Sequence, residues 1–225
     1  SSLERAVQVS TQMVSLISVF VNGTNKHVVT SMVEKFGDGF AHVGVVINKT
    51  GIVFRQLQLH GSQRLPWVNS LGTELNTFDL PFGRIAVIVG DDSRNPEIFR
   101  LAAYKNVEIA VCPSAFQMQW ETEFGLPERS AENRMNIIAA TRPNPSLGKF
   151  GTSILATTDP NLTLWKERET PFEGKVNYPR IQRADAAQDV FYGEITPSEC
   201  GNRMLAPEAD LVDGRLFSLL RPLTK

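Results

Sequence analysis

The chain has 225 residues, of which 42% are apolar and 21% charged, and its formal net charge is −1. This size and composition are typical of a globular protein with a substantial core. The near-zero net charge gives no reason to expect nucleic acid or an anionic membrane surface as a partner. Two cysteines, Cys112 and Cys200, exclude a disulfide scaffold and favour a reduced, cytoplasmic protein.

No apolar run approaches the length of a membrane span. The longest early run, VSLISVFV at residues 14–21, is too short and is predicted as a buried strand. The chain opens with SSLERAVQVSTQMV, whose apolar spacing predicts an amphipathic helix and not a signal peptide. A start inside a helix indicates that residues precede Ser1 in the natural protein.

Residues 15–22 are predicted to form a strand, and an irregular, Gly-rich stretch follows it. Residues 41–60 then predict two strands around a turn at 48–51, and residues 75–89 predict two more around a Pro-Phe-Gly turn. The second of these runs stops at Gly90-Asp91-Asp92.

A helix over residues 96–106 and a strand over 107–114 come next. Strand, helix and strand at this spacing predict a βαβ unit with parallel strands. Because ligands of such sheets bind beyond the carboxyl ends of the strands, residues 90–95 and 112–114 are predicted to share one rim. A helix starting near Pro127 and a strand at 136–141 repeat the unit.

The C-terminal third is less regular. A hairpin is predicted at 149–169 with its turn at 159–161, followed by an irregular segment over 171–188 and a last strand at 190–196. No repeat, low-complexity tract or linker interrupts the chain, which predicts a single α/β domain over residues 1–225.

Five segments in order resemble the nitrilase, or carbon–nitrogen hydrolase, superfamily: FDLPFGRIAVIV, DSRNPE, AVCPSAF, LPERSAENRMNIIAATRP and KFGTSILATTDPN. The resemblance implies an αββα sandwich in which the family's first strand, helix and strand would lie before Ser1. It therefore also implies that residues 1–225 are part of a longer chain.

Members of this family hydrolyse nitriles, amides or carbamoyl groups with a cysteine nucleophile, a glutamate base and a lysine. The family pattern places Gly90 at the cysteine and Gln56 at the lysine. The first family glutamate falls on a segment that this chain does not contain. An assisting glutamate is expected between Leu59 and Trp67, where HGSQRLP offers none.

Asp92 and Arg94 match residues that the family keeps beside its nucleophile. They are predicted to be a structural Asp–Arg pair that fixes the turn, with a ligand-binding role as the second interpretation. Asp91 replaces a family aromatic and is predicted either to face the rim or to be solvated. Adjacent carboxylates on an extended segment point in opposite directions, so Asp91 and Asp92 are not expected to act together.

Cys112 is the one thiol near the predicted rim, beside Pro113 and Ser114, which match positions that line the family pocket. A packed, inert thiol is the expected state, because no base or cation is evident to lower its pKa. Glu128 and Glu132 are predicted to be structural. The three histidines are too dispersed to suggest a metal site, and only His60 lies close to an expected loop of the pocket.

These features predict a nitrilase-fold domain that has lost hydrolysis and acts as a binding, regulatory or assembly module. The alternative is a working amidohydrolase of unusual mechanism that uses Cys112 or an imported residue. No cofactor or metal is predicted. The resemblance implies self-association, an upstream domain or a small-molecule ligand as partners.

Overall fold

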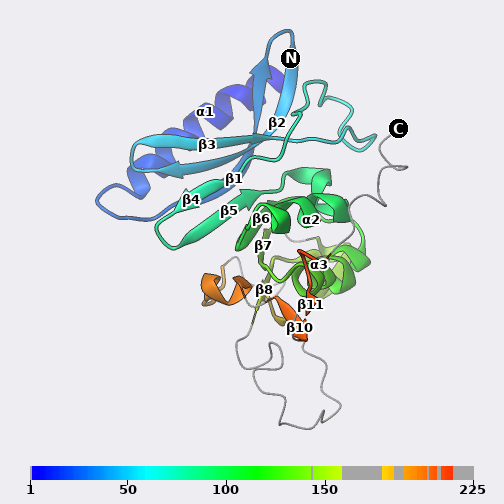
Figure 1. Cartoon of the computed structure of the whole chain (residues 1–225). Coiled ribbons are helices and arrows are strands. Elements are labelled where there is room, and N and C mark those ends of the chain that lie inside the picture. Colours follow the sequence, from blue (N-terminus) through cyan, green and yellow to red (C-terminus); the bar gives the residue numbers. More distant parts are fainter. Residues whose placement is uncertain are drawn as a thin grey trace.

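A computed structural model of the chain describes residues 2–142, 144–158, 179–184, 190–201, 203–206 and 209–214. The two larger β-sheets of these residues pack face to face, with helices on both outer faces (Figure 1). The layers run helix, sheet, sheet, helix, which is the predicted αββα sandwich.

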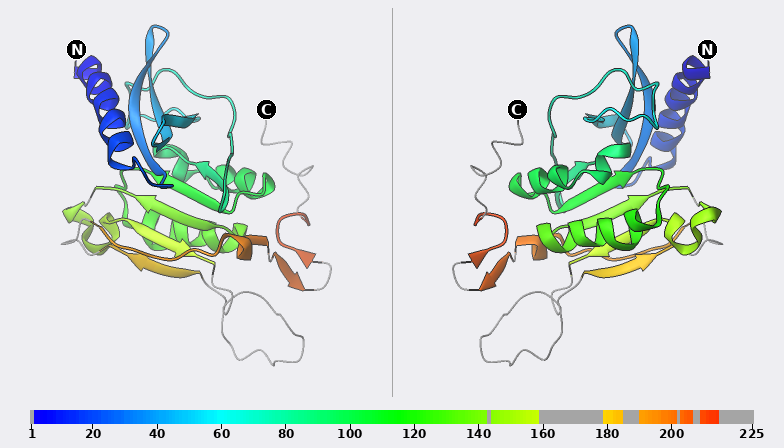
Figure 2. Two further views of the ribbon diagram at one scale, coloured as in Figure 1. Left: turned by 90° about the vertical axis from the view of Figure 1, so that its left-hand side faces the viewer. Right: turned by 90° about the vertical axis from the view of Figure 1, so that its right-hand side faces the viewer.

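The first two layers come from the N-terminal quarter of the chain. Helix α1 covers an antiparallel three-stranded sheet of order β1-β2-β3, with the bounds α1 (Ser2–Phe20), β1 (Val28–Phe36), β2 (Gly39–Asn48) and β3 (Gly51–Leu57). Figure 2 shows α1 along one outer side of the molecule. The turn predicted at residues 48–51 joins β2 to β3 as expected.

Two predictions in this region are wrong. Residues 15–22 were expected to form a strand, but α1 continues to Phe20. Met13, Val14 and Ile17 recur at helical spacing and pack on the sheet, while Leu16 and Phe20 stay exposed. A short apolar run fits either a strand or a helix, and here packing selected the helix. The stretch expected to be irregular contains β1.

The second sheet has six strands in the order β4-β5-β6-β7-β8-β9. Its strands and helices are β4 (Phe78–Leu80), β5 (Gly83–Val87), α2 (Pro96–Tyr104), β6 (Ile109–Pro113), α3 (Leu126–Asn133), β7 (Asn136–Ala140), β8 (Ile154–Thr157) and β9 (Arg180–Arg183). Strands β5, β6 and β7 are parallel, and α2 and α3 connect them. The two predicted βαβ units are therefore confirmed.

The C-terminal predictions have mixed outcomes. Strand β8 lies where the first arm of the 149–169 hairpin was expected, but the turn at 159–161 and the second arm lie outside the described residues. The strand predicted at 190–196 is wrong, because this segment has no regular structure and Tyr192 is 90% exposed. A short hairpin of β10 (Met204–Ala206) and β11 (Ala209–Asp210) follows.

Three apolar clusters fill the three spaces between the four layers. Met13 and Ile17 of α1 pack on Val43 and Val45. Between the sheets, Val46 and Phe54 meet Val87, Val111 and their neighbours. The largest cluster lies between the six-stranded sheet and α2 and α3, with Phe99 and Met135 fully buried. Among the described helices, none is long and apolar enough to cross a membrane.

Candidate functional site

A pocket of about 460 Å³ lies at the carboxyl ends of the three parallel strands. Gly90 and Asp91 follow β5, Pro113 and Ser114 follow β6, and Ala140 ends β7. The opposite wall comes from β1, His42 of β2 and the loop after β3; its lining residues are Val29, Thr30, Ser31, His42, Arg64, Leu65 and Trp67. The pocket thus forms where the predicted rim faces the other sheet.

Gly90 sits in this pocket with a left-handed backbone, at a φ of 55°. The hydroxyls of Ser93 and Ser114 both donate hydrogen bonds to its carbonyl oxygen, at 2.8 and 2.9 Å. A Cβ on Gly90 would lie 2.6 Å from Oε1 of Gln58 and 2.7 Å from Nδ1 of His42. The space that a side chain at position 90 would need is therefore occupied by these two residues.

His42 and Gln58 hold each other in place beside Gly90. Gln58 is fully buried and donates from Nε2 to the carbonyl of His60 at 2.7 Å, so its Oε1 accepts the hydrogen bond from Nδ1 of His42 at 2.9 Å. The ring of Trp67 meets the His42 ring edge-on, at 5.7 Å between centroids. Burial lowers the pKa of His42, although the Gln58 bond and the Asp92 charge oppose this shift.

Gln56, at the position matching the family lysine, is engaged elsewhere. Its amide nitrogen donates to the carbonyls of Leu57 and Glu74, and its oxygen accepts from the backbone N–H of Asn76 at 2.8 Å. With both ends of the amide bonded to backbone, the 2% exposed side chain fixes the loop that follows β3. The structure places Gln56 outside the pocket lining.

Asp92 also fixes that loop. Its carboxylate accepts hydrogen bonds from the backbone N–H groups of Leu59 and His60 and from Nδ1 of His60, at 2.7 to 2.9 Å. Burial raises the pKa of Asp92, and these three hydrogen bonds oppose the rise. The predicted Asp92–Arg94 pair is therefore wrong, because Asp92 binds a loop more than 30 residues away in sequence.

Asp91 and Arg94 join a cluster of charges at the pocket's edge. The Arg64 guanidinium pairs with Asp91, and Arg94 donates to Glu121 at 2.7 Å. Asp91 is 7% exposed and lines the pocket, so it faces the rim and is not solvated. Asp91 and Asp92 bind different partners, as predicted, but they do so from a 3-10 helix over Gly90–Arg94 and not from the extended segment on which that prediction rested.

Glu121 anchors the far end of the cluster. It is 4% exposed and accepts hydrogen bonds from the backbone N–H groups of Gln117 and Met118, both at 2.7 Å. Burial alone would raise the pKa of Glu121, but the hydrogen bond from Arg94 and the two backbone bonds outweigh it and hold the pKa below its ordinary value. Arg64 Nη1 is buried without a hydrogen-bond partner among the described residues.

Cys112 lies under the pocket but does not face it. The side chain is fully buried in the cluster beneath α2, and burial raises the pKa of its thiol far above the ordinary value. The thiol is packed as the sequence predicts, and its inertness stays a prediction. Glu132 pairs with Arg100 and Arg129, which agrees with its predicted structural role.

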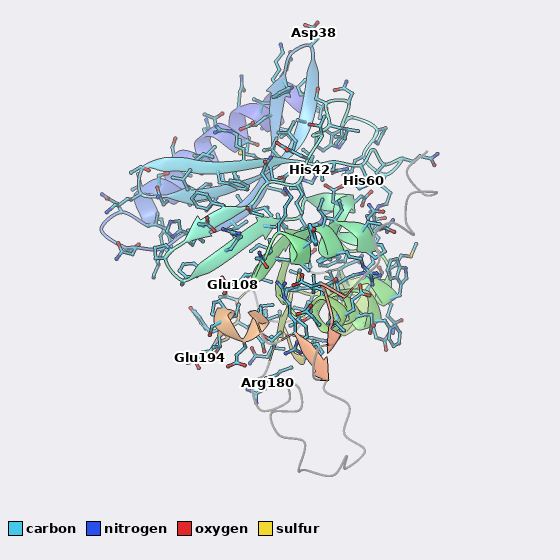
Figure 3. All side chains as sticks on the ribbon, in the orientation of Figure 1. Asp38, His42, His60, Glu108, Arg180 and Glu194 are labelled. Carbon is cyan, nitrogen blue, oxygen red and sulfur yellow. The ribbon has the colours of Figure 1, made fainter. Side chains whose placement is uncertain are left out.

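The residues closest to Gly90 were not singled out by sequence patterns. His42 lies on β2 and Gln58 directly after β3, while Arg64 and Glu121 meet across 57 positions of the chain. Figure 3 shows His42 and His60 near the junction of the two sheets. Within the described residues, no group of His, Cys, Asp and Glu side chains is arranged to hold a metal ion.

Comparison with known proteins agrees with this architecture. No family model matches the sequence. A nitrilase from Pyrococcus abyssi is 27% identical over 137 residues, which cover 60% of this chain and 52% of that protein. The chain therefore spans about half the length of the curated relative it matches.

Solved structures of similar fold include a carbon–nitrogen hydrolase and an amidase. A carbon–nitrogen hydrolase from Helicobacter pylori superposes with a TM-score of 0.71 at 15% identity, covering 98% of this chain and 78% of that one. An amidase from Nesterenkonia, whose active-site cysteine carries an acetamide group, has a TM-score of 0.56 at 14% identity, covering 67% and 60%. The fold is that of the carbon–nitrogen hydrolases. The predicted resemblance and fold class are thereby confirmed.

Proposed function

We propose that this carbon–nitrogen hydrolase fold binds a small molecule without hydrolysing it, and serves as a binding or regulatory module. The observation that carries the proposal is the surroundings of Gly90. Glycine supplies no nucleophile, and His42 and Gln58 fill the space into which a side chain at position 90 would extend. The pocket around it nevertheless remains open, at about 460 Å³.

The lack of a group that could activate a nucleophile also supports the loss of hydrolysis. A thiol becomes a nucleophile when a nearby base or cation stabilises its thiolate. The position that matches the family lysine carries Gln56, whose amide is bonded to loop backbone. The alternative is an active amidohydrolase that uses Cys112 or an imported residue as its nucleophile. The Cys112 thiol is buried beneath α2, and burial raises its pKa.

The direct test is an ammonia-release assay on small amides and nitriles, comparing the unaltered chain with Gly90→Cys. We expect both proteins to match the buffer blank, because restoring the thiol restores neither a cation nor room for the side chain. Ammonia release by the unaltered chain would overturn the proposal. Release by Gly90→Cys alone would show that the remaining machinery is intact and that only the thiol is missing.

We also propose self-association as the route to an assembly role. Leu101 and Tyr104 on α2 are 38% and 58% exposed, and Trp120 and Phe124 beyond β6 are 46% and 65% exposed. Exposed apolar side chains of this size are common at interfaces between subunits. Light scattering on the purified chain should give twice the monomer mass, and Phe124→Glu should lower it; a monomer mass at high concentration contradicts self-association.

A further inference from the structure

The connection between α1 and β1 contains an Asn-Gly pair. Asn22 and Gly23 are exposed and lie in a turn just beyond Phe20, the last residue of α1. Figure 1 shows this connection at the left edge of the molecule. The Asn22 carboxamide is therefore open to water, next to the backbone nitrogen of a residue that has no side chain.

The backbone nitrogen of Gly23 is held beside the Asn22 side chain. It donates a hydrogen bond to Oδ1 of Asn22 at 3.0 Å, and the carboxamide carbon Cγ is bonded to that oxygen. The N–H groups of Asn22 and Thr24 donate to backbone carbonyls three residues earlier, whereas the Gly23 N–H makes no backbone–backbone hydrogen bond among the described residues. The nitrogen of Gly23 is thus placed next to Cγ, and no ladder or helix hydrogen bond ties it down.

Glycine at position 23 leaves the approach to Cγ open. Gly23 has a φ of 74°, and nothing lies within 4 Å of the place where a Cβ would stand. A side chain here would crowd the nitrogen beside it, and it would also restrict the backbone rotation that brings nitrogen and carbon together. The fold therefore does not oppose a reaction between these two atoms.

We propose that Asn22 is a site of spontaneous deamidation. The Gly23 amide gives its proton to hydroxide, and its nitrogen attacks Cγ of Asn22. The N–Cγ bond forms and the Cγ–Nδ2 bond breaks, so the side-chain nitrogen takes up a proton from water and leaves as ammonia. Water then opens the resulting succinimide at either carbonyl, which gives an aspartate or an isoaspartate at position 22. Water is the only co-reactant, and nothing is oxidised or reduced.

Two other asparagines near turns are held differently. Oδ1 of Asn48 accepts hydrogen bonds from the backbone N–H and the hydroxyl of Thr50, two residues further on. Oδ1 of Asn69 accepts from the backbone N–H of Phe40, and the nitrogen that follows Asn69 donates to the Phe40 carbonyl. In both cases the side chain is bonded away from the next backbone nitrogen, so neither should react at the rate of Asn22.

The change would affect the connection into β1, the strand that supplies Val29, Thr30 and Ser31 to the pocket lining. Either product adds a carboxylate just beyond the C-terminal end of α1, where the helix dipole is also negative. Isoaspartate in addition lengthens the main chain between α1 and β1. Deamidation at Asn22 thus goes beyond the proposed binding function and is independent of it.

Peptide mapping of the folded chain tests the proposal. The chain is incubated at pH 7 and at pH 9, digested with trypsin and compared with a sample digested at time zero. The peptide of residues 6–26 should gain the mass that replacement of –NH2 by –OH produces, with one ammonia released for each converted chain. Conversion should be faster at pH 9, because more of the Gly23 amide is deprotonated.

Asn25 is an internal control in the same peptide. It is also exposed, but the N–H of Lys26 that follows it donates to Oγ1 of Thr24. Fragmentation should place the mass gain on Asn22 and leave Asn25 unchanged. Equal conversion at the two positions overturns the proposal. Conversion of Asn22 in urea but not in the folded chain also overturns it, because the fold would then protect the site.

Two variants identify the reacting groups. Asn22→Gln keeps the carboxamide but adds a methylene group, so the attack would have to close a larger ring and conversion should stop. Gly23→Ala should slow conversion severalfold, whereas Gly37→Ala, at another turn glycine with nothing within 4 Å of its would-be Cβ, should leave it unchanged. An unchanged rate in Asn22→Gln or in Gly23→Ala overturns the proposal. This ammonia release needs no added amide or nitrile, so it is distinguished from hydrolysis by a sample of protein alone.

Discussion

The substitution Gly90→Ala probes the space at the centre of the pocket. Gly90 has a φ of 55°, and holding an L-residue in this conformation costs roughly 1–2 kcal/mol. The added Cβ would meet Oε1 of Gln58 at 2.6 Å and Nδ1 of His42 at 2.7 Å. These atoms are tied to each other and to the His60 carbonyl, so they cannot simply move aside, and overpacking of this kind costs roughly 1–3 kcal/mol more.

Together these effects predict a loss of about 3 kcal/mol in the free energy of unfolding, from the backbone and packing terms above. For a domain of this size, that loss lowers the Tm by roughly 6–12 °C. The measurement is urea and thermal denaturation of the unaltered chain and of Gly90→Ala, monitored by circular dichroism. Equal m-values for the two proteins would allow their stabilities to be compared directly.

Gly37→Ala is the matched control. Gly37 has a φ of 60° in the turn between β1 and β2, and nothing lies within 4 Å of its would-be Cβ. Gly37→Ala therefore has the same backbone cost as Gly90→Ala, and alanine restricts the unfolded chain equally in both variants. Only Gly90→Ala adds a steric clash. Gly90→Ala should therefore be the more destabilising by about 2 kcal/mol. Equal losses in the two variants would refute the claim that His42 and Gln58 occupy the space at Gly90.

Three further results are expected. Asp92→Asn should cost about 2 kcal/mol, because two backbone N–H groups lose a carboxylate partner, and should speed amide exchange in the loop after β3. Glu121→Gln should cost about 2 kcal/mol at pH 7, because Arg94 loses its closest counter-charge and keeps only Asp91, at 4.0 Å. Since the pKa of Glu121 is lowered by folding, its contribution is present above pH 4.5 and is lost at more acidic pH, where the two stability curves should converge. Iodoacetamide at neutral pH should leave Cys112 and Cys200 unmodified in the folded protein and alkylate both in denaturant, as shown by intact mass.

Each result has a contrary outcome. Unchanged amide exchange in Asp92→Asn would mean that the loop is held by other contacts. A constant gap between the Glu121→Gln and unaltered curves down to pH 3 would contradict the lowered pKa. Rapid alkylation of Cys112 in the folded state would revive the amidohydrolase alternative.

Sequence patterns predicted the layered architecture well where the hydrophobic periodicity agreed with the residues that mark turns and helix starts. The turn after β5, the Pro at the start of α2 and the apolar run of β6 mark the βαβ unit without ambiguity. The prediction of a strand at residues 14–21 was wrong because a short apolar run fits both a strand and a helix. The choice between them depends on which side chains find a packing partner. Val19 and Phe20 of α1 are adjacent in the chain and both exposed, so burial does not alternate as it would in a strand.

The site was predictable only in part. The strand-end rule placed Gly90, Asp91, Pro113 and Ser114 on one rim, and the pocket lies there. The opposite wall could not be inferred, because the contact between His42 and Gly90 depends on how one sheet faces the other. Gln58, two positions beyond the residue that matches the family lysine, carries no sequence signal that distinguishes it from Gln56.

The claim that this fold binds without hydrolysing is tested most directly by incubating the chain with benzamide at millimolar concentration and following the sample by NMR over days. The account predicts saturation transfer from protein to benzamide and no growth of benzoate resonances above the buffer blank. Growth of benzoate in proportion to protein concentration, abolished by substitution of His42 or Cys112, would contradict it.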